Sequence, residues 1–188
     1  MNKTRWLGRL QWSSWLGHPL LIDGAHNPAA ATALRQYVDT LNKPVVWVMG
    51  MLTTKDHEDI FEALLKPRDE LHLLPVPDHS SAEPAELAAI AFNVCPELTS
   101  CSTHEDVFIA LDKAIAQSKI QREYVSDRSL LGVATVYGKA NSFGSGKLVV
   151  NIPQSQESET EKVIVLCGSL YLIGAVLQKV GMRVEKEK

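Results

Sequence analysis

Short, mostly apolar runs alternate along this chain with longer segments whose apolar residues recur at helical spacing. The clearest of the apolar runs are residues 44–50, PVVWVMG, and residues 162–167, KVIVLC. A strand that is apolar on both sides must be covered on both faces, which is the situation of a parallel sheet between two layers of helices. The alternation therefore predicts an α/β fold, with a Rossmann-like, mostly parallel sheet and helices on both of its faces.

The same alternation predicts where the elements lie. Parallel strands are expected at residues 20–22, 44–50, 70–76, 98–102 and 162–167, with an antiparallel strand at 9–15 before them. Helices are expected at residues 28–41, 56–65, 84–92, 107–117 and 169–180. Capping boxes, in which a Ser or Thr side chain begins the helix, are expected at Thr53-x-x-Asp56, Ser80-x-x-Glu83 and Thr103-x-x-Asp106.

One segment departs from this rhythm. Residues 119–161 contain Gly, Ser, Asn and Gln, and they form a stretch too long to be an ordinary loop of a compact domain. Two β-like runs, LLGVATVY and KLVVNIP, flank the sequence NSFGSG, and the following QSQESETE has the composition of disordered chain. We therefore expect one domain over residues 1–188 that carries a flexible insertion at 119–161.

Composition narrows the classes of function. With 188 residues, 45% of them hydrophobic, the chain can bury the core of one domain. Its formal net charge of −3 argues against a nucleic-acid-binding protein, and no apolar run is long enough to cross a membrane. The three cysteines are odd in number and form no CxxC motif, which fits a reducing cytoplasm better than a disulfide framework. The scattered histidines show no metal-ligand spacing, so no metal site is expected.

The stretch LLIDGAHNPAAATAL, residues 20–34, places polar residues where a strand meets a helix. Asp23 would lie at the carboxyl edge of the sheet, where open α/β folds bind ligands, and Gly24 would allow a tight turn. Asn27 and Pro28 suit the start of a helix, whose N-terminal N–H groups and positive dipole end favour an anion. His26 can reach the same anion, and the Asp23 carboxylate suits hydroxyls such as those of a ribose. The alternative is that these residues form only a turn and a helix cap.

Four motifs, in order along residues 5–177, resemble those of one enzyme family. DGAHNP (23–28) resembles the signature that opens the C-terminal domain of folylpolyglutamate synthase and dihydrofolate synthase, members of the Mur ligase superfamily. RWLGRLQ (5–11) is similar to the family's W-P-G-R-x-Q, with Leu7 in place of proline. MGMLTTKD (49–56) and CGSLYLIGAVL (167–177) resemble its G-x-x-x-x-K-D and G-S-L-Y-L-x-G motifs.

The resemblance implies a part of an ATP-dependent ligase. Such enzymes use ATP and Mg²⁺ to convert a folate or dihydropteroate carboxylate to an acyl phosphate, which the amine of L-glutamate then attacks. The nucleotide lies between a central P-loop domain and the C-terminal domain. By this resemblance Arg9 and His26 would lie at the phosphates and Asp23 at the ribose. Weaker candidates for the same cleft are Asn27, Lys55, Asp56 and Ser169.

Each of these candidates also has a structural alternative. Lys55 and Asp56 can be a surface pair and a helix cap, and Ser169 can belong to a close-packed turn between a strand and a helix. Tyr171 is expected in the core. No residue of this chain is expected to be catalytic or to bind the metal, because the resemblance places the Mg²⁺ ligands and most of the folate site in the central domain.

A P-loop is missing from this sequence. The nearest string, NSFGSGKL, has Asn141 where the first glycine of the motif is needed and Leu148 where Ser or Thr is needed. The chain therefore resembles the C-terminal domain alone. It can be a fragment of a full ligase, which we favour, half of a split enzyme that binds a separate P-loop domain, or a stand-alone, non-catalytic binding or interaction module. The sequence does not separate dihydrofolate synthase, folylpolyglutamate synthase and the bifunctional form.

Overall fold

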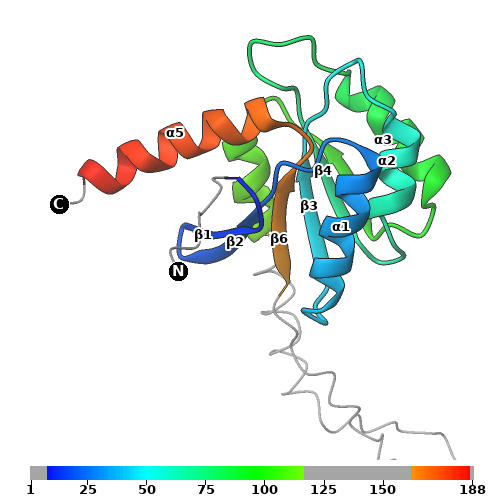
Figure 1. Cartoon of the computed structure of the whole chain (residues 1–188), viewed down its shortest axis with the longest axis horizontal. Coiled ribbons are helices and arrows are strands. Elements are labelled where there is room, and N and C mark those ends of the chain that lie inside the picture. The colour runs from blue at the N-terminus through cyan, green and yellow to red at the C-terminus, as the bar shows by residue number, and fades with distance from the viewer. Residues whose placement is uncertain (1–7, 117–161, 187–188) are drawn as a thin grey trace, which may run out of the picture.

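The computed structural model describes residues 8–116 and 162–186. In these ranges six strands form one sheet in the order β1-β2-β6-β3-β4-β5 (Figure 1). β1 pairs with β2 antiparallel, and every other neighbouring pair is parallel. The strands are β1 (Gln11–Trp15), β2 (His18–Ile22), β3 (Val45–Met49), β4 (Glu70–Leu73), β5 (Ser100–Thr103) and β6 (Val163–Cys167). The insertion expected at 119–161 lies outside the described residues, as do residues 5–7 of the first motif.

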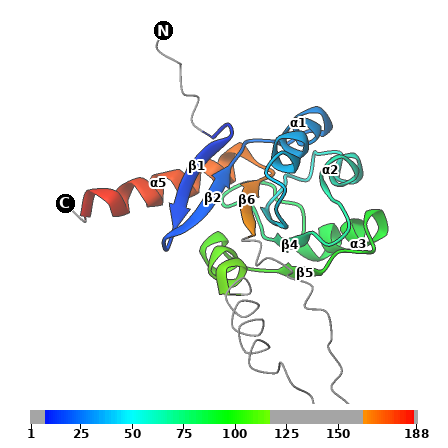
Figure 2. The same cartoon turned by 90° about the horizontal axis from the view of Figure 1, so that it is seen from below.

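Helices cover both faces of this sheet, as the sequence predicts. Figure 2 shows the helices of residues 28–39, 57–64 and 84–94 on one side, and those of residues 107–116 and 170–186 on the other. The bounds are α1 (Pro28–Asp39), α2 (His57–Leu64), α3 (Pro84–Val94) and α5 (Leu170–Lys186). None of the helices in the described ranges has the length and apolar content needed to cross a membrane. The predicted α/β fold with a mostly parallel sheet is confirmed.

The continuous apolar pattern of the strands follows from this two-sided cover. Trp47 and Val165 belong to the core cluster formed with α1, α2 and α3. Their neighbours in sequence, Val46 and Ile164, belong to the cluster formed with α5 and the helix of residues 107–116. Successive side chains of a strand point to opposite faces, so a strand covered on both sides must be apolar at every position.

The expected capping boxes are wrong, because the N-cap of each helix lies three residues after the Ser or Thr of the box. The N-cap positions of α2 and α3 are Asp56 and Glu83, and neither side chain bonds to a helix N–H. At the third box Asp106 is the cap, since its Oδ1 accepts an N–H from the first helical turn at 2.7 Å. The backbone N–H of Thr53 instead donates to Ser80 at 3.0 Å. A contact between two loops therefore takes the place of the local cap.

Candidate functional site

The loops that follow β2, β6 and β3 lie next to one another at the carboxyl edge of the sheet. The strand order places β6 between β2 and β3, although β6 is the last strand in the sequence. Asp23, Gly168 and Gly50 are the first residues after these three strands. Motifs that are far apart in the sequence are thereby collected at the edge where parallel sheets bind ligands.

Asp23 is bonded through both of its carboxylate oxygens. Oδ1 accepts the backbone N–H of Ala25 at 2.9 Å, which closes the turn after β2. Oδ2 accepts the backbone N–H of Leu10 at 2.8 Å, thirteen residues earlier in the chain. The carboxylate therefore joins the loop after β2 to the segment that enters β1.

A second contact joins the same two segments. The N–H of Gly24 donates to the carbonyl of Gly8 at 2.7 Å. Arg9, which is exposed, lies between the two bonded residues Gly8 and Leu10. The motif of residues 5–11 thus contacts the motif of residues 23–28. The prediction of a shared site for Arg9 and Asp23 requires this contact.

An added Cβ at position 24 would have close neighbours in two other segments. Gly24 is not among the described residues with positive φ, so its backbone does not demand glycine. A Cβ there would lie 2.4 Å from Cδ2 of Leu170, at the start of α5, and 3.3 Å from the carbonyl oxygen of Gly8. The loop after β2 therefore packs directly on the turn between β6 and α5, and the N–H of Gly168 donates to Ala25 at 2.9 Å.

His26 and Asn27 complete the loop after β2. Nδ1 of His26 lies 2.7 Å from the carbonyl oxygen of Gly24, so Nδ1 carries a proton and donates it to that oxygen. Asn27 is the N-cap of α1, as predicted, because its Oδ1 accepts the N–H of Ala30 at 2.9 Å and Pro28 follows it. The half-buried imidazole thus lies beside the positive end of a helix, which is an arrangement suited to an anion.

The other three weaker candidates, Ser169, Lys55 and Asp56, lie in the loops after β6 and β3 at the same edge. Ser169 is only 3% exposed, and its Oγ accepts the N–H of Tyr171 at 3.3 Å, which makes it a cap of α5. Lys55 and Asp56 lie between β3 and α2, on the other side of β6 from Asp23. Two bonds, Leu10 to Asp23 and Gly24 to Gly8, thus join the segment of Arg9 to the loop after β2. That loop carries His26 and Asn27, whereas Lys55 and Asp56 belong to the loop after β3.

Cys167, at the end of β6, is not equipped to act as a nucleophile. Its thiol is fully buried, and burial, with the nearby charge of Asp23, raises the pKa of Cys167 well above its ordinary value. A thiolate is the reactive form, so this thiol stays protonated and unreactive. Within the described ranges, no group of three or more His, Cys, Asp or Glu side chains is placed to hold a metal ion.

An aromatic pair at this edge was not expected. Tyr171 is 54% exposed, and its ring centroid lies 3.7 Å from that of His79, so the prediction that Tyr171 belongs to the core is wrong. The buried residues of α5 include Leu172, Ile173 and Val176. Their helical spacing, read from the sequence, would have placed Tyr171 on the outward face.

A pair of histidines joins β4 to the residue after β5. Nδ1 of His72 and Nε2 of His104 are 2.8 Å apart, and the two rings are stacked with centroids 5.0 Å apart. His72 is fully buried and His104 is half-buried. Burial, together with the charge of Lys113, lowers the pKa of His104 below its ordinary value of 6.5.

We expect the free energy of unfolding to fall as the pH is lowered below about 6.5, because the unfolded His104 then takes up a proton that the folded ring binds less well. The loss should level off below the lowered pKa of the folded state. Urea unfolding at pH 7.5 and 5.5 measures the difference, which should shrink in His104→Gln. His79→Gln, which removes an exposed ring, is the control and should leave the difference unchanged.

Sequence comparison finds relatives of one kind. The family model described as the C-terminal domain of dihydrofolate synthetase matches residues 13–137. The dihydrofolate synthetase of Saccharomyces cerevisiae is 27% identical over 168 residues, which are 85% of this chain and 30% of that protein. The chain therefore spans less than a third of the length of this relative.

Comparison with solved structures finds the same fold. Folylpolyglutamate synthase of Mycobacterium tuberculosis, complexed with ADP, is 21% identical with a TM-score of 0.64, over 94% of this chain and 33% of that one. The bifunctional folylpolyglutamate synthase/dihydrofolate synthase of Yersinia pestis, complexed with AMPPNP and Mn ion, is 21% identical with a TM-score of 0.58, over 94% and 32%. At these identities the likeness is one of fold.

Proposed function

Because this chain belongs to the family of dihydrofolate synthetase C-terminal domains, we propose that it is the domain of an ATP-dependent folate–glutamate ligase that closes over the nucleotide. The observation that supports the proposal is the pair of bonds, from Leu10 to Asp23 and from Gly24 to Gly8, that join the segment of Arg9 to the loop of His26. A guanidinium, an imidazole and a helix N-terminus on one sheet edge are suited to a polyphosphate.

The reaction that we propose for the complete ligase has two steps. A carboxylate oxygen of the pteridine substrate attacks the γ-phosphorus of ATP, which gives an acyl phosphate and ADP. The amine of L-glutamate then attacks the acyl carbon, the amide bond forms, and phosphate and a proton leave. Arg9 would offset charge that develops on the phosphate oxygens, since its guanidinium stays charged and donates in a fork. His26, whose Nδ1 donates to Gly24, would donate to the same phosphates through Nε2–H in its imidazolium form.

We propose dihydropteroate as the carboxylate substrate. The description of the matched family and the name of the yeast relative both favour the dihydrofolate-forming reaction. The pteridine would bind outside this chain, as would the Mg²⁺ ion, for which a P-loop domain would provide the ligands. The short coverage of the yeast relative supports the proposal that this chain is the C-terminal fragment of a longer ligase.

The intact mass of the endogenous polypeptide that carries this sequence tests the proposal of a fragment. A mass far above the 20.7 kDa of the chain, with a P-loop domain before Met1, is expected. A mass near 20.7 kDa would exclude the fragment. Addition of a P-loop domain in trans then distinguishes a split ligase from a stand-alone module, because ligase activity returns only for the former.

The role of Arg9 can be tested in the complete ligase with a matched pair of variants. Arg9→Gln is expected to lower kcat/KM for ATP by about 10- to 100-fold, the loss that corresponds to one or two charge-assisted hydrogen bonds. Arg68→Gln is the control, because Arg68 is an equally exposed arginine before β4, at the opposite edge of the sheet, and it should stay within about twofold of wild type. Equal effects of the two variants would exclude Arg9 from the nucleotide site.

A further inference from the structure

Arg9 lies in the short segment of residues 8–11 that leads into β1. The residues on either side of it, Gly8 and Leu10, both have positive φ, at +78° and +41°. Glycine has the greatest backbone freedom of all residues, and a leucine adopts a positive φ only when its surroundings hold it there. The direction of the Arg9 side chain therefore depends on contacts that fix the backbone on both sides of it.

The side chain of Gln11 supplies one of these contacts. Its Oε1 accepts the backbone N–H of Gly8 at 3.0 Å. A backbone N–H can only donate, so the oxygen of the amide, and not its nitrogen, must face Gly8. The bond closes a loop that contains Arg9 and Leu10 between its two ends.

Gln11 is itself fixed by the sheet. It is the first residue of β1, and it pairs with Ile22, the last residue of β2, in the antiparallel ladder. Gln11 is also half-buried. Because a group carried by a strand is placed more precisely than one carried by a loop, the bond to Gly8 extends the geometry of the strand to the residue before Arg9.

Two further contacts come from the loop after β2. The carbonyl of Gly8 accepts the N–H of Gly24 at 2.7 Å, and the N–H of Leu10 donates to Asp23 at 2.8 Å. Both backbone polar groups of Gly8 are therefore held, the carbonyl by Gly24 and the N–H by Gln11. Without the acceptor on Gln11, the glycine before Arg9 would be held at its carbonyl but not at its N–H.

We propose that Gln11 is a positioning residue, which holds the backbone of Gly8 so that the guanidinium of Arg9 is directed toward the phosphates of the nucleotide. The inference rests on the proposed function, because Gln11 acts on the reaction only through Arg9. In this role Gln11 does not contact the nucleotide, and its oxygen matters because it accepts the N–H of Gly8.

Replacement of Gln11 in the complete ligase tests this role. Gln11→Met keeps the length of the side chain without the oxygen, and it is expected to lower kcat/KM for ATP by about 3- to 10-fold, the loss of one neutral hydrogen bond. Gln11→Glu offers an acceptor oxygen at the same position and should stay within about twofold of wild type. A Gln11→Glu variant as weak as Gln11→Met would overturn the inference.

Gln36→Met is the matched control. It makes the same chemical change at an exposed position of α1, so kcat/KM for ATP should stay within about twofold of wild type. A loss equal to that of Gln11→Met would mean that the bond to Gly8 is not the cause, and it would also overturn the inference.

A double-mutant cycle separates the positioning of Arg9 from a general effect on structure. Gln11→Met is expected to lower kcat/KM for ATP by less than about twofold when Arg9 is already replaced by glutamine. An effect of equal size in both backgrounds would overturn the inference and leave the role of Arg9 intact. If Arg9→Gln alone has no effect, the proposed function fails and the inference fails with it. Should Gln11→Met fail to fold, Gln11→Val serves, because valine suits a strand and also lacks an acceptor.

Discussion

Replacement of Asp69 by alanine is expected to lower the free energy of unfolding by about 3–5 kcal/mol, the range observed when one partner of a buried charged network is removed. Asp69 lies directly before β4, at the sheet edge opposite the candidate site, and its side chain is 6% exposed. Burial raises the pKa of the Asp69 carboxyl, while the bonds from Trp47 and Arg35 act in the opposite direction. Burial of the Asp69 carboxylate is therefore costly, but Arg35 and Trp47 need it as a hydrogen-bond acceptor.

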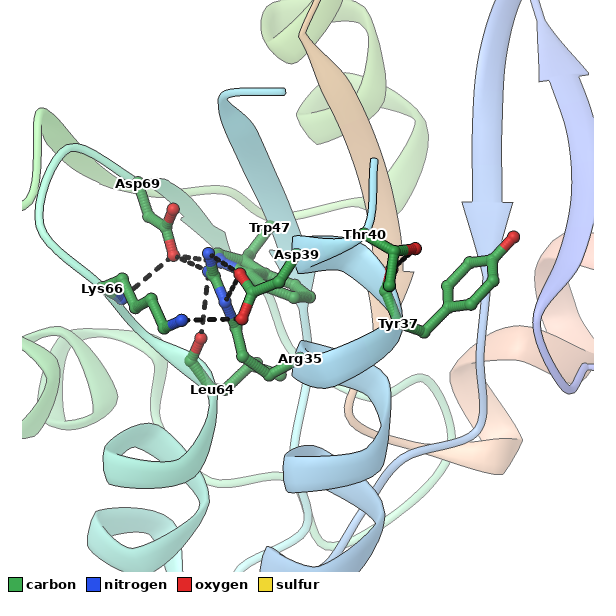
Figure 3. A network of polar contacts seen from close by, with 8 residues as sticks. All are labelled: Arg35, Tyr37, Asp39, Thr40, Trp47, Leu64, Lys66 and Asp69. Atoms are coloured by element: carbon green, nitrogen blue, oxygen red, sulfur yellow. Dashed lines mark hydrogen bonds and ion pairs between the residues drawn. The ribbon is translucent and has the colours of Figure 1, made fainter. Parts of the chain in front are cut away.

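Three donors meet at Oδ2 of Asp69 (Figure 3). They are Nη1 of Arg35 at 2.6 Å, Nε1 of Trp47 at 2.9 Å and the backbone N–H of Lys66 at 3.0 Å. Trp47 is wholly buried, so without Asp69 its N–H would remain in the core with no acceptor at that position, which costs about 1–3 kcal/mol by itself. Arg35 would keep its pair with Asp39 but lose its more buried partner.

Asp39→Ala is the matched control. Like Asp69→Ala, it removes one carboxylate partner of Arg35. The side chain of Asp39, however, is 37% exposed, and that of its other partner, Lys66, is 51% exposed. The expected loss is below about 1 kcal/mol, as for other surface ion pairs. Urea unfolding of the two variants with equal slopes measures the difference directly. If both variants lose the same free energy, the buried network does not stabilise the fold in the way described.

The contrast between these two aspartates also marks what could be predicted from the sequence. Local patterns identified the strands, the loop between β2 and α1, and the N-cap at Asn27, since each depends on a few neighbouring residues. Nothing local distinguishes Asp69 from Asp39. The difference arises because β3 and β4 lie side by side and bring Asp69 to Trp47, 22 residues away.

In the candidate site, too, some features follow from local sequence and others depend on contacts between distant residues. Asp23 and His26 could be assigned to the carboxyl edge because they follow an apolar run directly. The bond from Leu10 to Asp23 could not be predicted, since it joins residues 13 apart and requires a leucine with positive φ. The pairing of His72 with His104 was missed for a related reason, because a polar residue on a buried face has no signature in the alternation of apolar residues.

Gly168→Ala is expected to lower the free energy of unfolding by about 2–5 kcal/mol, through two separate effects. Gly168 has a φ of +99°, a conformation that costs an alanine about 1–2 kcal/mol. Its new Cβ would also lie 2.7 Å from the carbonyl oxygen of Gly50, and a backbone atom cannot rotate away as a side chain can. Relief of this overlap by a shift of β6 or β3 adds about 1–3 kcal/mol, the usual cost of overpacking.

Gly174→Ala, in the helix that follows Gly168, is the control and is expected to raise the free energy of unfolding. Gly174 lies within α5, and an added Cβ there would meet nothing within 4 Å, so alanine should stabilise the helix by up to about 1 kcal/mol. Because Gly168 also donates to Ala25, the proposed function predicts that its substitution weakens ATP use by the complete ligase and that Gly174→Ala does not. A Gly168→Ala variant as stable as wild type would mean that the ends of β6 and β3 do not approach each other as closely as described.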